Sequence, residues 1–565
     1  MRKFWKISRK ATFGWCMYDW ANSAFATSIT VAILPVYFVS LFKDSVGPET
    51  IMLGFTFTGS SVWSLSVAIS TAIVAITSPA LGIIADRKNI RKYLLITYTL
   101  VGSIFTVLLF FSVYFENLDW AWMFGCFLIA NVGFAGACVF YNSFLPHLGE
   151  RDEYDQISGR GFSYGYVGGG FLLVIHLALI MMFSGTTNED LVIRLCLASV
   201  GLWWFGFAIL TFMLVPEPKT EHSNDKISLI SAAKIAIAQL KITFSEIKKF
   251  RMLAIFLASY LLFNDGIQTV ISISGAFGSD TLGVSLLSNM ATILIVQFVA
   301  ALGSEISWKL SQLFGTKKAL VSTLIGWCIV ILLAIGFAPL EPKESKDFDY
   351  ILTSDNNGRY EATKSPELYD SNNDLEWESL FGYYLKDKVS LSERDTELIS
   401  QAVDISEFSR FTLLIQGGNL DGLTAIGPLH PVNQLKGPLG WWPKFMKNNI
   451  WGPLNLSVDM QWLTLGTMVG LVLGGSQSLA RSFFSYMTPQ SRSGEFFGFF
   501  GFVSRTSAVF GPMLYILITG ILDTRVAIAA ILVLILIGTY LLRYIDSEAG
   551  KIAAETEDNT INNNN

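Results

Sequence analysis

Residues 82–92 read Gly82-Ile-Ile-Ala-Asp86-Arg87-Lys88-Asn89-Ile90-Arg91-Lys92 and form a short basic stretch between two long apolar ones. The apolar neighbours, 60–85 and 93–115, are each long enough to cross a bilayer, because a spanning helix needs about 20 mostly apolar residues. Loops rich in Lys and Arg lie on the cytoplasmic side of membranes. The stretch therefore predicts a hairpin of two membrane helices whose loop faces the cytoplasm.

The same apolar pattern recurs along the whole chain of 565 residues. Hydrophobic residues make up 52% of the chain and charged residues only 15%, whereas soluble globular proteins have about 25% charged residues. This composition excludes a water-soluble globular protein. The other stretches of spanning length lie near 13–42, 120–145, 160–184, 191–215, 252–278, 285–308, 318–340, 460–485, 495–520 and 525–544. We therefore predict an all-α membrane protein with twelve transmembrane helices in two pseudo-symmetric six-helix bundles.

Polar segments divide the chain into regions. We expect an N-terminal six-helix bundle (1–215), a linker (216–251), the first part of a C-terminal bundle (252–340), an insertion (341–459), the last three helices of that bundle (460–545) and a disordered tail (546–565). The Lys and Arg bias of the short loops places both termini and the linker in the cytoplasm. It places the insertion on the opposite side.

The linker and the insertion each leave alternatives open. Between Ile227 and Phe250, apolar residues recur at helical spacing among scattered lysines. This spacing indicates an amphipathic helix on the inner membrane face, and a solvated linker helix is the alternative. The insertion has apolar segments at 381–385 and 411–415 that can form the core of a small folded cap. Its runs of Asp, Glu and Asn fit a mostly flexible segment equally well.

The two halves of the chain carry matching polar stripes inside apolar helices. The first helix contains Asp19-Trp-Ala-Asn22-Ser23, and the seventh contains Asp265-Gly-Ile-Gln268-Thr269. Residues i, i+3 and i+4 share one helix face. A carboxylate within the hydrocarbon is costly, so it faces either a partner or a wet cavity. We therefore predict that these six polar residues bind substrate or couple protons, with a structural hydrogen bond between helices as the alternative.

A second set of charged residues lies at the ends of predicted helices. We interpret them as gate charges that hold the inward side closed, and ordinary loop charge is the alternative reading. The set consists of Asp86, Arg87, Arg160, Arg481 and Glu495. Because helix N-termini attract carboxylates, we predict that Asp86 reaches the first turn of the eleventh helix.

The stretch at 82–92 resembles the loop signature of the major facilitator superfamily, which combines a Gly, an Asp-Arg pair and closing basic residues. Asn89 stands at the turn position that is usually Gly, and Asn tolerates the left-handed conformation that such a turn needs. Ile90 replaces a basic residue. The resemblance implies the fold already predicted from the spans, with helices one and seven lining a central cavity.

A closer resemblance begins at Tyr18-Asp-Trp-Ala-Asn-Ser-Ala-Phe25, which looks like the opening motif of the vacuole-effluxer family, also called the ubiquitous major-facilitator (UMF) family. Further similar motifs lie at 141–146, 158–162, 165–169, 264–269, 474–477, 481–482, 495–498 and 511–512. Arg505 stands where the family has Lys, and the insertion is outside its pattern. The best-described member type exports neutral amino acids from a yeast vacuole, so the resemblance implies a transport activity.

We expect a secondary active transporter of small solutes, in particular the efflux of neutral amino acids by alternating access with proton coupling. The alternatives are a receptor-like relative that senses a ligand through the insertion, and a lipid flippase. The sequence shows no nucleotide-binding loop, zinc spacing or nucleophile–base arrangement, so we expect no enzyme activity, cofactor or metal.

The expected partners are membrane lipid and a small-molecule substrate, without nucleic acid, and we expect a monomer. The sequence has a single glycosylation-type triplet, Asn455-Leu-Ser457, which lies close to the tenth span. The scarcity of such triplets favours a bacterial inner membrane over a vacuolar membrane.

Overall fold

The computed structural model describes residues 9–563 apart from 48, 53–54, 116–117, 219–248, 277–283, 285, 343, 356–357, 367–371, 386–388, 431, 434, 436 and 508–509. Within this part, 11 helices are long and apolar enough to cross a membrane, and the count is 12 if one bent pair is a single span. That pair joins Arg9–Ala32 to Leu34–Val46 with a bend of 42°. The chain is therefore a multi-pass, mostly helical membrane protein, as predicted.

The N-terminal bundle begins with the bent span. Its helices are α1 (Arg9–Ala24), the π-helix η1 (Phe25–Ala32), α2 (Leu34–Val46), α3 (Gly59–Lys88), α4 (Arg91–Leu108), η2 (Leu109–Tyr114), α5 (Asp119–Ser143), η3 (Leu145–His147), η4 (Arg151–Glu153), α6 (Tyr154–Phe183) and α7 (Glu189–Leu214). A short antiparallel hairpin of β1 (Glu49–Met52) and β2 (Phe55–Thr58) joins α2 to α3.

The C-terminal bundle repeats this order after the linker. Its helices are α9 (Arg251–Ala276), α10 (Leu286–Phe314), α11 (Thr316–Ile335), α15 (Val458–Tyr486), η10 (Gln490–Arg492), α16 (Ser493–Thr506), α17 (Phe510–Ile521), α18 (Thr524–Leu541), η11 (Leu542–Tyr544) and α19 (Ser547–Asn563). Each bundle has its own apolar core, one around Trp15, Phe25 and Trp204 and one around Trp327, Phe484 and Phe497.

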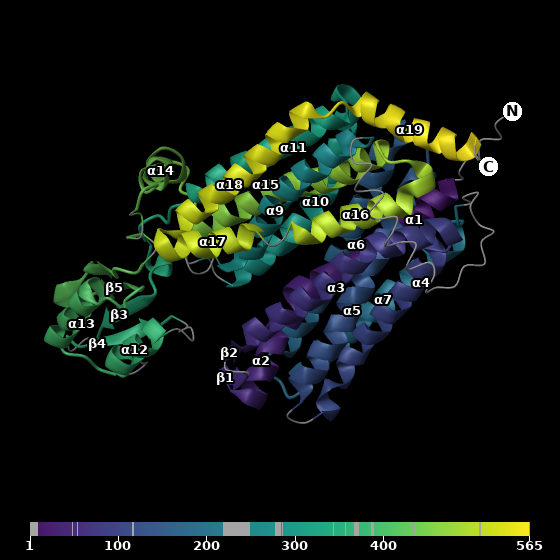
Figure 1. Cartoon of the computed structure of the whole chain (residues 1–565). Coiled ribbons are helices and arrows are strands. Elements are labelled where there is room, and N and C mark those ends of the chain that lie inside the picture. Colours follow the sequence, from purple (N-terminus) through teal and green to yellow (C-terminus); the bar gives the residue numbers. More distant parts are fainter. Residues whose placement is uncertain are drawn as a thin grey trace.

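The contacts between the bundles follow the internal repeat. Helix α3 packs against α16, and α6 packs against α10. Because α3 and α10 are the second spans of their halves while α6 and α16 belong to the fifth spans, the two contacts are equivalent. The bundles meet near α19 and separate toward the end where the insertion projects (Figure 1). We call these the gate end and the insertion end.

The insertion is a folded α+β domain, which decides between the two alternatives left open by the sequence. Its sheet has the order β4-β3-β5-β6, with β3 parallel to β5 and the other neighbours antiparallel. The elements are η7 (Ser345–Asp347), β3 (Tyr350–Ser354), β4 (Tyr360–Lys364), α12 (Asn372–Phe381), α13 (Glu393–Ile405), β5 (Thr412–Gln416), η8 (Gly418–Leu420) and β6 (Thr424–Ile426). Trp377, Phe411 and Leu413 are fully buried in its separate core.

The returning segment, with α14 (Trp441–Met446) and the π-helix η9 (Lys447–Trp451), belongs to the C-terminal bundle rather than to the insertion. The last carbonyls of a helix have no partner within it. Side chains of Trp442, Trp451, Gln461 and Arg525 donate hydrogen bonds to the carbonyls of Leu332, Ile335, Gly336, Phe337 and Ala338, at 2.8–3.0 Å. We call these four donors the stem clamp. The independent domain therefore ends before the predicted boundary at 459.

The C-terminal tail differs from its predicted disorder, because α19 packs on the gate end of the C-terminal bundle. Ala554 is fully buried and Glu557 is 7% exposed. Contacts with the bundle outweigh the polar composition that suggested disorder. The amphipathic helix predicted in the linker falls largely on 219–248, which lies outside the described residues. The linker's described ends contact residues of the gate end: Glu217 accepts hydrogen bonds from Arg91 and Lys92, and Lys249 pairs with Glu557 of α19.

Candidate functional site

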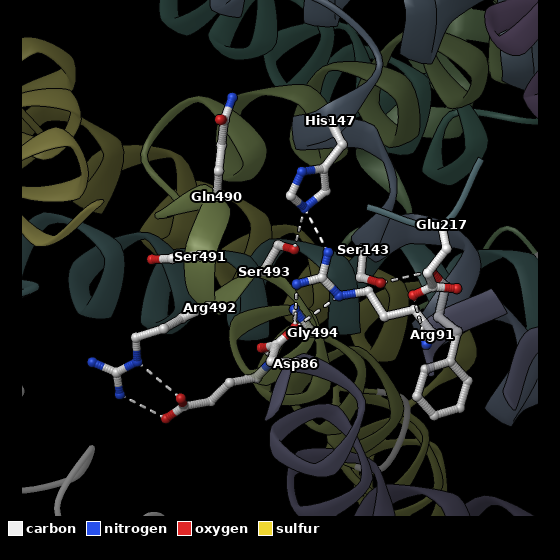
Figure 2. A network of polar contacts seen from close by, with 12 residues as sticks. Asp86, Arg91, Ser143, His147, Glu217, Gln490, Ser491, Arg492, Ser493 and Gly494 are labelled. Carbon is white, nitrogen blue, oxygen red and sulfur yellow. Dashed lines mark hydrogen bonds and ion pairs between the residues drawn. The ribbon is translucent and has the colours of Figure 1, made fainter. Parts of the chain in front are cut away.

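Asp86, in the last turn of α3, joins the two bundles. Its Oδ1 accepts a hydrogen bond from the backbone N–H of Gly494 at 2.8 Å, and its Oδ2 accepts one from Glu495 at 2.7 Å. These N–H groups belong to the first turn of α16, where they have no partner within the helix. Nε of Arg91 donates to Oδ1 of the same carboxylate at 2.8 Å, and Nη2 of Arg91 lies 2.5 Å from that oxygen in an ion pair. The predicted contact of Asp86 with the eleventh span is confirmed, and Figure 2 shows this network.

Two glycines let the helix backbones approach each other beside Asp86. A Cβ placed on Gly82 would lie 2.1 Å from the carbonyl oxygen of Gly494, well inside any real contact. One turn further along, the hydroxyl of Ser78 donates to the carbonyl of Gly498 at 3.1 Å. The Gly of the loop motif is therefore required by the close packing of α3 on α16.

His147 and Glu217 belong to the same network and were missed from the sequence. Nε2 of His147 lies 2.6 Å from the guanidinium of Arg91 and 3.0 Å from the hydroxyl of Ser493 (Figure 2). A guanidinium only donates, so Nε2 must accept and the ring must be neutral. Glu217 accepts from the backbone N–H groups of Arg91 at 3.0 Å and Lys92 at 2.6 Å, although burial raises the pKa of its carboxyl.

Glu495 extends the network to the tail of the chain. Arg492 binds both of its carboxylate oxygens, at 2.8 and 2.9 Å. The same guanidinium binds Glu557 of α19 at 2.9 Å. Of the other predicted gate residues, Arg160 is exposed on α6, and the side chain of Arg87 lies outside the described part of the structure.

A second acid at the gate end, Asp155, also joins the two bundles and was also missed from the sequence. Asp155 lies in the first turn of α6. Its carboxylate accepts hydrogen bonds from the hydroxyls of Ser482 at 2.5 Å and Thr316 at 2.6 Å, both from the C-terminal bundle. The gate end is thus held by one acid from each of α3 and α6.

Asp19 and Arg481, predicted for separate roles, contact each other across the bundles. Two guanidinium nitrogens of Arg481 on α15 lie 3.2 and 3.3 Å from Oδ2 of Asp19 on α1. The hydroxyl of Tyr141 donates to the same oxygen at 2.8 Å. Both charged side chains are almost completely buried. The structure therefore places a charge of each sign within the apolar spans at the bundle interface.

Neutral groups of the N-terminal bundle hold the guanidinium of Arg481. It donates to the hydroxyl of Ser158 at 2.9 Å, to the carbonyl of the same residue at 3.0 Å, and to the side chain of Asn142 at 3.2 Å. The rings of Trp15 and Phe162 lie with their centroids 4.7 and 4.1 Å from its central carbon. Both distances are within the range of a cation–π contact.

The remaining residues of the predicted stripes are more dispersed. Asn22 is buried and lies 3.7 Å from the Sγ of Cys138, and Ser23 is half-buried against Gly165. On α9, Asp265 is 2% exposed.

The other two residues of the second stripe differ in exposure. The Thr269 hydroxyl donates to the Asp265 backbone carbonyl at 2.6 Å, and Gln268 is half-buried. The described contacts join Asp19 to Arg481 and do not join it to Asp265.

Comparison with known proteins identifies relatives over most of the chain. The family described as "Vacuole effluxer Atg22 like" matches residues 7–340 and 431–555, on both sides of the insertion. An uncharacterised MFS-type transporter, YxiO of Bacillus subtilis (strain 168), is 30% identical over 329 residues, which are 57% of this chain and 72% of that protein. Autophagy-related protein 22-1 of Aspergillus niger is 22% identical, over 96% of this chain and 89% of that protein.

Two solved structures of transporters have a similar fold. The MFS proton:xylose symporter XylE is similar with a TM-score of 0.56 at 11% identity, covering 96% of each chain. A bacterial homologue of the iron transporter ferroportin, in an outward-facing state, is similar with a TM-score of 0.52 at 9% identity. That match covers 95% of this chain and 98% of the other.

Proposed function

This chain belongs to the vacuole effluxer Atg22-like family of the major facilitator superfamily, and from that premise we propose that it exports neutral amino acids by alternating access. The family's description as an effluxer supports the direction of transport. The observation that carries the proposal is the buried contact between Asp19 and Arg481. A buried ion pair adds little to stability compared with apolar packing, so its position at the interface between the two bundles is better explained by a transport role.

The gate end supplies the second part of the mechanism. Asp86 and Asp155 hold α16, α15 and the start of α11 against the N-terminal bundle. In the proposed cycle these contacts form when the gate end closes and break when it opens. The polar stripes on α1 and α9 then face the substrate path, and Asn22, Ser23, Gln268 and Thr269 provide neutral hydrogen-bonding groups along it.

We also propose that transport is coupled to protons, with Asp19 or Asp265 as the coupling acid. A coupling acid that becomes Asn should abolish accumulation driven by a pH gradient while exchange of substrate continues. A structural acid that becomes Asn should lower the folding yield and reduce both activities equally. If Asp19→Asn and Asp265→Asn both retain full proton-dependent transport, proton coupling by these acids is wrong.

The test of function is transport by the purified protein in proteoliposomes. A panel of labelled neutral amino acids is measured for uptake and efflux, with and without a pH gradient, against protein-free liposomes. Saturable flux of neutral amino acids supports the proposal. Movement of a labelled phospholipid without amino-acid flux would instead indicate a flippase. Binding of a ligand to the insertion without any flux would indicate a receptor-like role.

We place the protein in the membrane as a monomer with both termini in the cytoplasm, so that the gate end is the inner end. The basic loops at the gate end support this orientation. We favour a bacterial inner membrane, with a vacuolar membrane as the alternative. Protease protection of a tag at the C-terminus of right-side-out vesicles tests the orientation.

A further inference from the structure

The contact between Asp19 and Arg481 is looser than the ion pair between Arg492 and Glu495 at the gate end. Arg492 binds both oxygens of Glu495 at 2.8 and 2.9 Å. Arg481 reaches only one oxygen of Asp19, at 3.2 and 3.3 Å. Charge-assisted hydrogen bonds of full strength measure about 2.7–2.9 Å. The geometry thus shows a pair whose partners approach each other without forming the strongest bond available to them.

Asp19 keeps capacity for another ligand, and Arg481 keeps other partners if the pair separates. Within the described part of the chain, Tyr141 and Arg481 both use Oδ2 of Asp19, while Oδ1 accepts no hydrogen bond. The Asp19 side chain retains 10% exposure. Ser158 and Asn142 hold Arg481 independently of Asp19. The two charges can therefore separate without either side chain losing all of its partners.

A carrier must also reorient without substrate, which restricts the charges that it can hold. An uncompensated charge inside the apolar spans is costly, whereas two opposite charges in contact compensate each other. A ligand with a single charge could compensate only one of them and would leave the other exposed to an apolar environment. A zwitterion can compensate both at once, because its carboxylate pairs with a guanidinium and its ammonium pairs with a carboxylate.

We propose that Asp19 and Arg481 are the two poles of a binding site for a zwitterion. In the empty carrier the two side chains pair with each other. Arg481 binds the substrate α-carboxylate, and Asp19 binds the α-ammonium through the oxygen that carries no hydrogen bond. The inference rests on the proposed function and adds the residues that select the substrate class. The rings of Trp15 and Phe162 contact the guanidinium and give the carboxylate pole an apolar environment.

The experiment measures binding of L-alanine, L-valine and L-phenylalanine to the purified full-length protein by calorimetry. Each is compared with the amine that lacks its carboxylate and with the acid that lacks its ammonium. Asp19→Asn and Arg481→Gln should each weaken amino-acid binding by at least about 30-fold, because each leaves one buried charge of the complex without its partner. The analogues should respond in the opposite direction: Asp19→Asn strengthens binding of the acids, and Arg481→Gln strengthens binding of the amines.

The double variant Asp19→Asn/Arg481→Gln is the control for misfolding, because it removes both charges and leaves neither unpaired. It should elute as a monodisperse protein and bind none of the amino acids. If each single variant weakens binding of the amino acids, the amines and the acids equally, the proposed site is wrong and the ion pair has only a structural role. Amino-acid transport with unchanged binding in the variants would overturn the site while the proposed function stands. Absence of amino-acid flux in the wild-type protein would remove the proposed function and the site together.

Discussion

The carboxylate of Asp86 accepts a hydrogen bond from the backbone N–H of Gly494, 408 positions later in the chain. The contact joins the end of the second span to the start of the eleventh. The buried Arg91 donates to the same carboxylate. The conformational equilibrium of the two bundles should therefore respond to changes at this one acid.

Replacing Asp86 with Asn should open the gate end. The amide can accept through one oxygen only, and it leaves Arg91, which is 1% exposed, without its counter-charge. Removal of one partner from a buried ion pair costs about 3–5 kcal/mol. Spin labels at the exposed Tyr93 and Leu313 should move apart. The distance between them is measured by pulsed electron paramagnetic resonance in a variant without the native cysteines. Asp44→Asn, an exposed acid on α2, should leave the distance unchanged.

Replacing Gly82 with Ala should have a similar effect through packing alone. The added methyl group would overlap the carbonyl oxygen of Gly494 at 2.1 Å, so α3 and α16 must separate. Overpacking of this kind costs typically about 1–3 kcal/mol. The matched control is Gly125→Ala, whose added Cβ meets nothing within 4 Å. If thermal unfolding and the label distances are the same for both variants, the close approach does not contribute to gate closure.

The effect of a substitution at His147 on the gate end should depend on whether the new side chain can accept a hydrogen bond. Its Nε2 accepts from Arg91, so Gln, which also offers an acceptor, should preserve the closed gate end. Lys offers only donors and adds a positive charge beside Arg91, so it should open the gate end. Acidic pH should act on the wild-type protein as Lys does, because a protonated ring has no acceptor. If the gate end opens at the same pH in the wild-type protein and in the His147→Gln variant, His147 is not the group that responds to acid.

Docking of α19 should depend on pH through Glu557. Burial alone would raise the pKa of this carboxyl, but the ion pairs with Lys249 and Arg492 outweigh it and hold the pKa below its ordinary value of 4.5. The docked state is therefore stabilised above pH 4.5 and loses this contribution as the pH falls through the lowered pKa. A spin label at the exposed Ile552 should become mobile in acid. Glu557→Gln should show that mobility at neutral pH, whereas Glu555→Gln should not.

Removal of residues 342–430 and closure with a flexible Gly/Ser linker should leave the membrane core folded. The domain has its own apolar core, and the family match resumes at residue 431. Loop-closure entropy changes slowly with loop length, so the new connection costs little. The shortened protein should stay monodisperse in size-exclusion chromatography. By contrast, Trp451→Ala removes a buried side chain of the stem clamp and should destabilise by about 3–5 kcal/mol.

Most of the membrane helices could be predicted from the hydrophobicity and charge of the sequence. The stretch predicted at 460–485 is α15 (Val458–Tyr486), because a long apolar segment has few alternatives to a spanning helix. The first span was less predictable. A π-helix at Phe25–Ala32 and a 42° bend interrupt the stretch predicted at 13–42. Pro35, at the start of α2, cannot donate to the preceding turn, and this is the local signal for the break.

The site was only partly predictable, because its contacts join distant parts of the chain. The rule that carboxylates favour helix N-termini was enough to pair Asp86 with the eleventh span. No local pattern could pair Asp19 with Arg481, which are separated by 462 positions. Asp155 and His147 lie beside turns, where polar residues are common and carry no specific signal. Their roles depend on partners that only the folded chain brings near.

The stem clamp at the end of α11 has a practical consequence for imaging. Trp442 and Trp451 hold the returning chain against the end of α11, and Gln461 and Arg525 hold that end of α11 within the C-terminal bundle. The insertion therefore projects from one bundle only (Figure 1). A particle made of two similar bundles is difficult to orient in a detergent micelle, and this projecting mass marks which bundle is which. An antibody fragment raised against its sheet would enlarge that mark for electron cryomicroscopy while leaving the path between the bundles untouched.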